Sequence, residues 1–220
     1  FDYVRDLLDH LPTSAFDPLP EAWAPADEDL DDAHLNAFLP DDTNAGYDMM
    51  ELLVQLGDDD TLVEVQSGYA ENLICAFGRI DGRPVGFVAN NPMYLAGCID
   101  ADAADKGARF IRTCDAYGIP LVYVVDTPGY MPGVEQERQG LIHRGAKFAF
   151  AGVEATVPKV ALIVRKAYGG AYCVMGSKGL GADVTLAWPT AQIAVMGAAG
   201  AVGLLHRREV QHARDAGLSD

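Results

Sequence analysis

The chain has 220 residues, half of them hydrophobic, which is enough for one sizeable globular domain with its own core. No apolar run approaches the roughly 20 residues that a membrane helix needs, so we expect no membrane span. The net charge of −16 comes from residues 1–60, which hold 17 acidic residues and one basic residue. Such an acidic segment disfavours binding to nucleic acid or to an anionic membrane surface.

The first quarter of the chain has the composition of a connector. Residues 1–47 are rich in Pro and Asp, and the one regular element predicted there is a short helix over residues 4–11. A second helix is predicted over residues 47–56, where apolar residues recur at helical spacing. We assign residues 1–60 to an acidic, Pro-rich linker with an entry helix, and favour a solvated connector over an acidic docking surface.

From residue 61 onwards, predicted strands and helices alternate. Strands over residues 73–80 and 85–89 are joined by a hairpin-like turn. The later strands are short and fully apolar, which indicates a sheet covered on its faces and therefore an α/β fold. The further helices are predicted over residues 101–117, 140–154 and 170–178, and the further strands over residues 121–125, 160–165, 184–187 and 193–195.

The four cysteines indicate neither a disulfide framework nor a metal site. Cys75, Cys98, Cys114 and Cys173 form no C-x-x-C pair, and no His lies at metal-ligand spacing from them. Reduced thiols in a cytoplasmic protein are the simplest interpretation. The first residues lack the features of a signal or transit peptide, and because the chain does not begin with Met we expect the natural polypeptide to start earlier.

Two segments at strand ends stand out, because open α/β folds bind ligands at the carboxyl ends of their strands. They are residues 126–133 (DTPGYMPG) and residues 166–172 (KAYGGAY). In the second, the amides of Gly170 and Ala171 would open a helix, where amides have no intrahelical acceptor and lie at the positive end. Such a pair can bind an oxyanion. Equally, Gly-Gly-Ala can serve only the close packing of strand on helix.

No side chain stands out as a catalytic base or nucleophile. The sequence lacks G-x-S-x-G, H-E-x-x-H, Walker A and G-x-G-x-x-G motifs. His143 is expected on the surface, and Ser177 in a helix without a paired base. Asp126 could be a base, but the Thr-Pro-Gly after it also suits a role in holding the turn. Backbone donors without a base suit a reaction in which a cofactor supplies the chemistry.

Several blocks follow one another in order between about Gly78 and Leu205. They include DKGARF (105–110), DTPGYMPG (126–133), RKAYGGAY (165–172) and AWPTA (187–191). In these blocks the chain resembles the carboxyltransferase β subunits of propionyl-CoA and acetyl-CoA carboxylases. The resemblance implies a crotonase-like (ClpP/crotonase) fold with ββα units, with residues 61–220 as the C-terminal carboxyltransferase domain. The family's N-terminal half would be missing, and residues 1–60 resemble the linker between the halves.

The resemblance also implies a mechanism and a site. N-carboxybiotin on a carrier protein would enter a crevice and lose CO2, and the Gly170 and Ala171 amides match the family's oxyanion hole for the ureido oxygen. The freed biotin nitrogen would take the α-proton of an acyl-CoA, whose enolate would attack CO2, so no protein base is required. The residues that would contact biotin are Gly169, Tyr172, Cys173, Pro128 and Gly129.

The implied substrate is a short- or medium-chain acyl-CoA of the propionyl or acetyl type, and the product malonyl-CoA or methylmalonyl-CoA. Cys173 occupies a position where propionyl-type members often carry Asp, which leaves the acyl preference open. The implied partners are a biotin carboxylase, a biotin carboxyl carrier subunit and further copies of the chain in a hexamer. We expect no metal, and interpret residues 196–202 as close helix packing or a subunit contact.

Three other functions stay open. The nearest is the α subunit of a biotin-dependent acyl-CoA decarboxylase, or the acyl-CoA half of a transcarboxylase, because these share the same loops. A crotonase-type hydratase or isomerase would need a Glu or Asp near Gly170, and none is found there. The third is a non-catalytic module that docks a biotin carrier.

Overall fold

The fold is built on one mixed sheet, which is antiparallel at one edge and parallel through the rest. A computed structural model describes residues 1–23, 35 and 37–215. The described residues form a seven-stranded sheet in the order β1-β2-β3-β4-β5-β6, with β7 also paired to β5. Pairing is antiparallel from β1 to β3 and parallel from β3 onwards. The strands are β1 (Val63–Glu64), β2 (Leu73–Ile80), β3 (Arg83–Asn90), β4 (Leu121–Thr127), β5 (Lys159–Tyr168), β6 (Val184–Ala187) and β7 (Gln192–Ala194).

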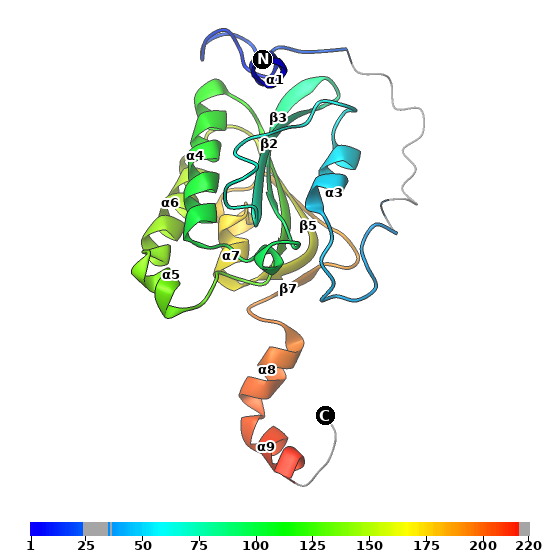
Figure 1. Cartoon of the computed structure of the whole chain (residues 1–220), viewed down its shortest axis with the longest axis vertical. Helices are drawn as coiled ribbons and strands as arrows, with labels where there is room; N and C mark the ends of the chain where they lie inside the picture. Colours follow the sequence, from blue (N-terminus) through cyan, green and yellow to red (C-terminus); the bar gives the residue numbers. More distant parts are fainter. Residues whose placement is uncertain (24–34, 36, 216–220) are drawn as a thin grey trace.

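Helices cover both faces of this sheet, as predicted (Figure 1). On one face, α4 (Ala101–Tyr117) and α6 (Leu141–Glu154) share a core with Leu73 of β2, and on the other α3 (Met49–Leu56) shares a core with Ile74. Neighbouring strand residues thus point to opposite layers. The remaining elements are α1 (Asp2–Asp9), η1 (Leu95–Gly97), α5 (Val134–Arg138), α7 (Gly169–Val174), η2 (Lys178–Leu180), α8 (Ala198–Leu205) and α9 (Arg207–Asp215).

The ends of α4 follow directly from the sequence. The side chain of Asp100 accepts a hydrogen bond from the Ala103 amide at 2.9 Å, and Gly118 ends the helix in the left-handed conformation with φ of 73°. The prediction over residues 101–117 is therefore confirmed at both ends. No helix among the described residues is long and apolar enough to cross a membrane.

Some predicted boundaries were wrong. The first helix spans Asp2–Asp9 instead of residues 4–11, and the second begins at Met49 because Asp48 caps it by accepting from the Met50 amide. Strand β5 continues to Tyr168, so the next helix covers Gly169–Val174 instead of residues 170–178. The strand β1, the helices α5, α8 and α9 and the two 3-10 turns were not predicted. The domain division after residue 60 stays a prediction.

A buried carboxylate joins β4 to β5. Asp126 is 1% exposed, and its Oδ2 accepts hydrogen bonds from Arg165 Nε at 2.9 Å and from the Tyr47 hydroxyl at 2.7 Å. Its Oδ1 accepts from the Lys166 amide at 2.9 Å. Arg165 also lies 4.9 Å above the Tyr47 ring and donates to the Ala45 carbonyl. Burial and the Asp126 charge both raise the pKa of Tyr47, so this phenol stays protonated as a donor.

The same carboxylate holds an irregularity in the sheet. Val125 pairs with Ile163 and Thr127 pairs with Ala167, so three residues of β5 lie opposite the single residue Asp126 of β4. Such bulges redirect a strand and are common beside functional sites. Here the bulge lies just before the turn from β5 into α7, so the Asp126 contacts determine where that turn lies.

We predict that Gly107→Ala lowers the free energy of unfolding by about 1–3 kcal/mol, although Ala is the better helix former. A Cβ at Gly107 of α4 would lie 2.8 Å from Phe148 and 2.9 Å from Leu73. Gly203→Ala in α8 is the matched control, because nothing lies within 4 Å of its Cβ position. It should leave stability unchanged or raise it by up to about 1 kcal/mol in urea denaturation. Equal effects at both sites would contradict the packing described.

We also predict that Asp126→Asn lowers the free energy of unfolding by about 3–5 kcal/mol, because Arg165 would remain buried without its counter-charge. Tyr47→Phe should cost less, about 1.5–3 kcal/mol, since it removes one hydrogen bond and keeps the ion pair. Urea denaturation of both variants measures the order. A Tyr47→Phe protein less stable than Asp126→Asn would contradict this account.

Candidate functional site

The two predicted loops meet at the carboxyl ends of the parallel strands. The loop after β4 is tied to the segment after η1, because the Ile99 amide donates to the Gly129 carbonyl at 3.1 Å and the Met131 amide donates to Ile99 at 2.9 Å. Between these two bonds, Tyr130 reaches the first turn of α7. Its ring atoms lie 3.7–3.8 Å from the position that a Cβ of Gly170 would take. Tyr130 therefore brings the two loops together.

The two glycines of the turn serve different purposes. Gly169 has φ of 56°, and a Cβ there would lie 3.2 Å from the Val195 carbonyl, so the turn itself requires glycine. Gly170 is exposed, has no positive φ, and a Cβ there would make only ordinary contacts with Tyr130. The packing explanation thus holds for Gly169 and fails for Gly170. Open space beside Gly170 is what close approach of a ligand needs.

Two backbone donors face this space. Gly170 and Ala171 lie in the first turn of α7, where their amides have no intrahelical acceptor, and no other acceptor pairs with them in the part of the chain that the structure describes. The Ala171 methyl group is fully buried in the core, which fixes the backbone at this point. Such a pair of amides can bind the oxygen of a planar group, for example the ureido oxygen of biotin. A side chain at residue 170 would occupy the space that this group needs.

The other predicted contacts lie around the same turn. Tyr172 is half-buried and Cys173 is exposed, with its thiol 3.5 Å from the Gly169 carbonyl. Burial raises the pKa of the Tyr172 phenol, and the nearby Cys173 raises it further by a smaller amount. Pro128 and Gly129 are half-buried in the loop that carries Tyr130.

Tyr130 was not predicted from the sequence as a site residue. Its hydroxyl is buried without a hydrogen-bond partner among the described residues, and a Cβ on Gly145 of α6 would lie 2.9 Å from it. Burial raises the pKa of Tyr130 to about 12, so the phenol stays neutral near pH 7. Its position between Gly145 and Gly170 makes it a spacer between α6 and α7. No local sequence pattern indicates this contact, because Gly145 is a helix residue outside both loops.

The remaining candidate side chains are not catalytic groups of this site. The prediction that Asp126 holds its own turn or acts as a base was wrong, because its carboxylate is buried between Arg165, Tyr47 and the Lys166 amide. His143 is exposed on α6, as predicted. Ser177 lies after α7, at the start of η2, instead of inside a helix.

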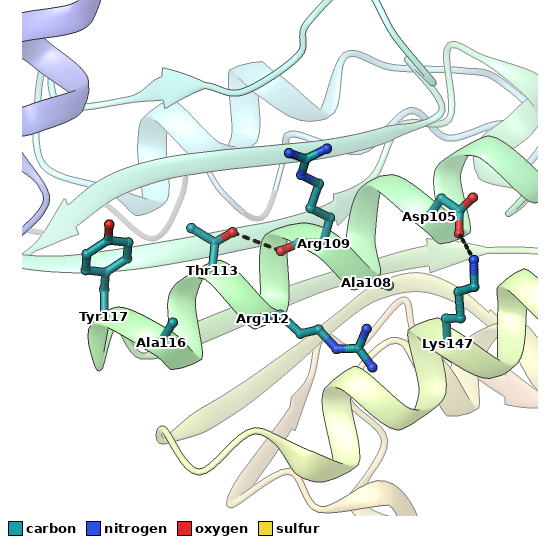
Figure 2. A pocket seen from close by; sticks show the side chains of 8 residues that line it. All are labelled: Asp105, Ala108, Arg109, Arg112, Thr113, Ala116, Tyr117 and Lys147. Atoms are coloured by element: carbon teal, nitrogen blue, oxygen red, sulfur yellow. Dashed lines mark hydrogen bonds and ion pairs between the residues drawn. The ribbon is translucent and has the colours of Figure 1, made fainter. Parts of the chain in front are cut away.

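Away from this turn, a groove of about 600 Å³ lies on the outer face of α4 and α6 (Figure 2). An ion pair between Lys147 and Asp105, 3.3 Å long, crosses between the two helices there. None of the residues predicted to bind biotin contributes to it, so we place the candidate site at the β5–α7 turn. The groove is lined by Asp105, Ala108, Arg109, Arg112, Thr113, Ala116, Tyr117 and Lys147.

The chain is similar to characterised carboxyltransferase subunits along its length. It is 55% identical over 220 residues to the biotin-dependent acetyl-/propionyl-coenzyme A carboxylase beta5 subunit of Mycobacterium tuberculosis, with 97% of this chain and 40% of that protein covered. It is 49% identical over 214 residues to the methylmalonyl-CoA decarboxylase subunit alpha of Propionigenium modestum, with 97% and 41% covered. This chain thus spans about 40% of the length of these relatives.

Among solved structures, the chain superimposes on transcarboxylase 12S, described as a hexamer with methylmalonyl-coenzyme A bound. The TM-score is 0.87 and the identity 44%, with 95% of this chain and 40% of that one covered. This likeness establishes the crotonase-like fold that the sequence resemblance implied. The family model for the carboxyl transferase domain matches residues 1–220. The chain belongs to the carboxyl transferase domain family.

Proposed function

We propose that this chain forms the biotin-facing half of a carboxyltransferase, which moves CO2 from N-carboxybiotin to the α-carbon of a short- or medium-chain acyl-CoA. The observation that carries the proposal is the pair of unpaired amides at Gly170 and Ala171, beside a glycine that the fold itself does not require. Propionyl-CoA and acetyl-CoA are the favoured substrates, supported by the similarity to an acetyl-/propionyl-CoA carboxylase subunit.

In this mechanism the protein binds and orients, and the carrier-bound cofactor supplies both the CO2 and the base. The Gly170 and Ala171 amides would donate hydrogen bonds to the ureido oxygen of bound carboxybiotin and so stabilise negative charge on it. Removing one such donor typically costs about 3 to 4 kcal/mol of barrier. The ring of Tyr130 packs beside the donor turn, and Pro128 and Gly129 precede Tyr130 in the same loop. No side-chain base is needed, in agreement with the engaged state of Asp126.

The acyl preference of the site depends in part on Cys173, which is exposed on the first turns of α7. A thiol is smaller and less polar than a carboxylate, so we infer a tolerance for apolar acyl groups at this wall. The role of Cys173 is therefore contact with the substrate and not nucleophilic attack, because no His lies beside it in the sequence.

We further propose that the site is completed by another subunit, in a hexamer, and that a biotin carboxylase and a biotin carboxyl carrier subunit supply the carboxybiotin. Helix α8 supports a subunit contact, since it projects from the sheet (Figure 1) and buries none of its residues in the described chain. Its exposed apolar residues include Val202, Leu204 and Leu205. The close helix packing considered for residues 196–202 is absent within the described residues. We also propose that the protein is located in the cytoplasm.

A second candidate is the α subunit of a biotin-dependent decarboxylase, or the acyl-CoA half of a transcarboxylase. The 49% identity to a methylmalonyl-CoA decarboxylase subunit and the likeness to transcarboxylase 12S favour it. The loops of this chain suit either reaction, so the complex that exchanges the carboxyl group decides between the two candidates.

The test is to isolate the native complex that contains this chain and to supply ATP, bicarbonate and a panel of acyl-CoAs. We expect avidin-sensitive formation of malonyl-CoA or a substituted malonyl-CoA, and the panel identifies the preferred acyl group. Sodium-dependent decarboxylation without carboxylation would instead favour the decarboxylase. Failure of both reactions would remove the proposal and leave the carrier-docking function.

Gly170→Val is expected to abolish carboxyl transfer while the protein keeps its fold and oligomeric state, because the side chain would fill the space that the ureido group needs. Gly170→Ala is the graded control, since its Cβ would lie at an ordinary 3.7 Å from Tyr130 and the fold accommodates it. Turnover by each variant is compared after size-exclusion chromatography and thermal unfolding confirm an unchanged fold. Near-normal turnover by Gly170→Val would exclude this turn from the mechanism.

A further inference from the structure

Lys166 is a half-buried cation for which the described residues provide no counter-charge. It lies in β5, within the irregularity opposite Asp126, and is four residues before Gly170. Its backbone amide is held by Asp126 Oδ1, but its ammonium group has no hydrogen-bond acceptor and no carboxylate partner in the described chain. The Lys166 Nζ is not one of the fully enclosed polar atoms that lack a partner, so the ammonium group stays open to solvent. An anion from outside the described chain can therefore reach it.

The buried cations elsewhere in the molecule are all engaged. Arg165 pairs with Asp126 at 2.9 Å, Lys106 donates to the Tyr69 carbonyl at 2.8 Å, and Arg79 donates to three backbone carbonyls. Lys159 donates to the Ala155 carbonyl at 2.7 Å. Among the buried and half-buried Lys and Arg side chains that the structure describes, Lys166 is therefore the one without a partner.

The position of Lys166 places its charge at the candidate site. Arg165 and Lys166 are neighbours on β5, and Arg165 is committed to Asp126 on the α3 side. The charge of Lys166 instead acts on Cys98, at the end of η1, where it partly offsets the effect of burial on the pKa of that thiol. Cys98 precedes Ile99, whose backbone is bonded to the loop that carries Tyr130. Lys166 pairs with Gln192 of β7, and the next residue, Ala167, pairs with Thr127 at the end of β4, so Lys166 lies at the carboxyl ends of the parallel strands.

We propose that the Lys166 ammonium binds the new carboxylate of the carboxylated acyl-CoA, which forms when the acyl-CoA enolate attacks CO2. This inference rests on the proposed function. The amides of Gly170 and Ala171 are uncharged donors suited to the ureido oxygen, whereas the new carboxylate is a full negative charge that persists in the product. An ammonium–carboxylate hydrogen bond is short and strong. Lys166 would hold the carboxylate beside the acyl α-carbon.

Binding of carboxylated and uncarboxylated thioesters tests this without biotin and without turnover. The dissociation constants of methylmalonyl-CoA and propionyl-CoA are measured by calorimetry on the intact protein. The ratio of the two constants isolates the contribution of the carboxylate. In Lys166→Met the preference for methylmalonyl-CoA should fall roughly 10- to 100-fold, as expected for loss of a charged hydrogen bond, with propionyl-CoA binding little changed. Lys166→Arg should keep most of the preference, because it keeps the charge.

Lys178→Met is the matched control, since Lys178 is an exposed lysine of η2 and should leave the ratio unchanged. An unaltered ratio in Lys166→Met would overturn the inference, and so would an equal loss in Lys178→Met. Failure of the proposed function is separately visible, because the wild-type protein would then show no avidin-sensitive carboxyl transfer. Gly170→Val should lose transfer and keep the methylmalonyl-CoA preference, the opposite pattern to a carboxylate-binding defect.

Discussion

The buried carboxylate of Asp126 is the interaction on which the geometry of this molecule depends. It lies between two parallel strands and accepts hydrogen bonds from Arg165, from the Tyr47 hydroxyl and from the Lys166 amide. A buried charge is tolerated only when it is paired and fully hydrogen-bonded, so these groups are held in one arrangement. The residues between Ile163 and Ala167 must bulge to reach it, and the strand that emerges leads directly into the donor turn.

A site built from backbone amides places unusual demands on the sequence. Every residue except proline supplies a backbone amide, so the requirements fall on neighbours that leave room or fix the main chain. Gly170 leaves room, Gly169 permits the turn, Ala171 anchors the helix in the core and Tyr130 supports it from the side. Each of these residues is chemically inert, which explains how a site can be present without an acid, base or nucleophile. Reactivity in such a site has to come with the bound cofactor.

The sequence predicted the layered α/β fold and the turn from strand into helix at the Gly-Gly pair, because both leave local signals. Strands that are apolar along their length, helices with apolar residues at regular spacing and a Gly-Gly pair after a strand can each be recognised within about ten residues. Helix α4 was predicted with the bounds that the structure has, where Asp100 caps its start and Gly118 ends it. The resemblance to carboxyltransferase subunits then connected the turn to a reaction.

What the sequence could not predict depends on contacts between distant residues. Strand β5 was predicted to end at Arg165, because two charged residues in succession normally end a buried strand. Arg165 is buried only because Asp126, 39 residues earlier, neutralises it. Asp126 was interpreted as a turn residue because its partner Arg165 is far away in the sequence. The role of Tyr130 as a spacer depends on Gly145, which lies in helix α6 outside its loop. The unpaired state of Lys166 likewise becomes visible only when the partners of the other cations are known.

The most direct test of the account is a crystal structure of the intact protein with biotin bound. The account predicts that the ureido oxygen lies about 3 Å from both the Gly170 and Ala171 amides, within hydrogen-bond distance, with the ring system over the open side of Gly170. A ureido group bound away from these amides, for example in the groove between α4 and α6, would contradict it.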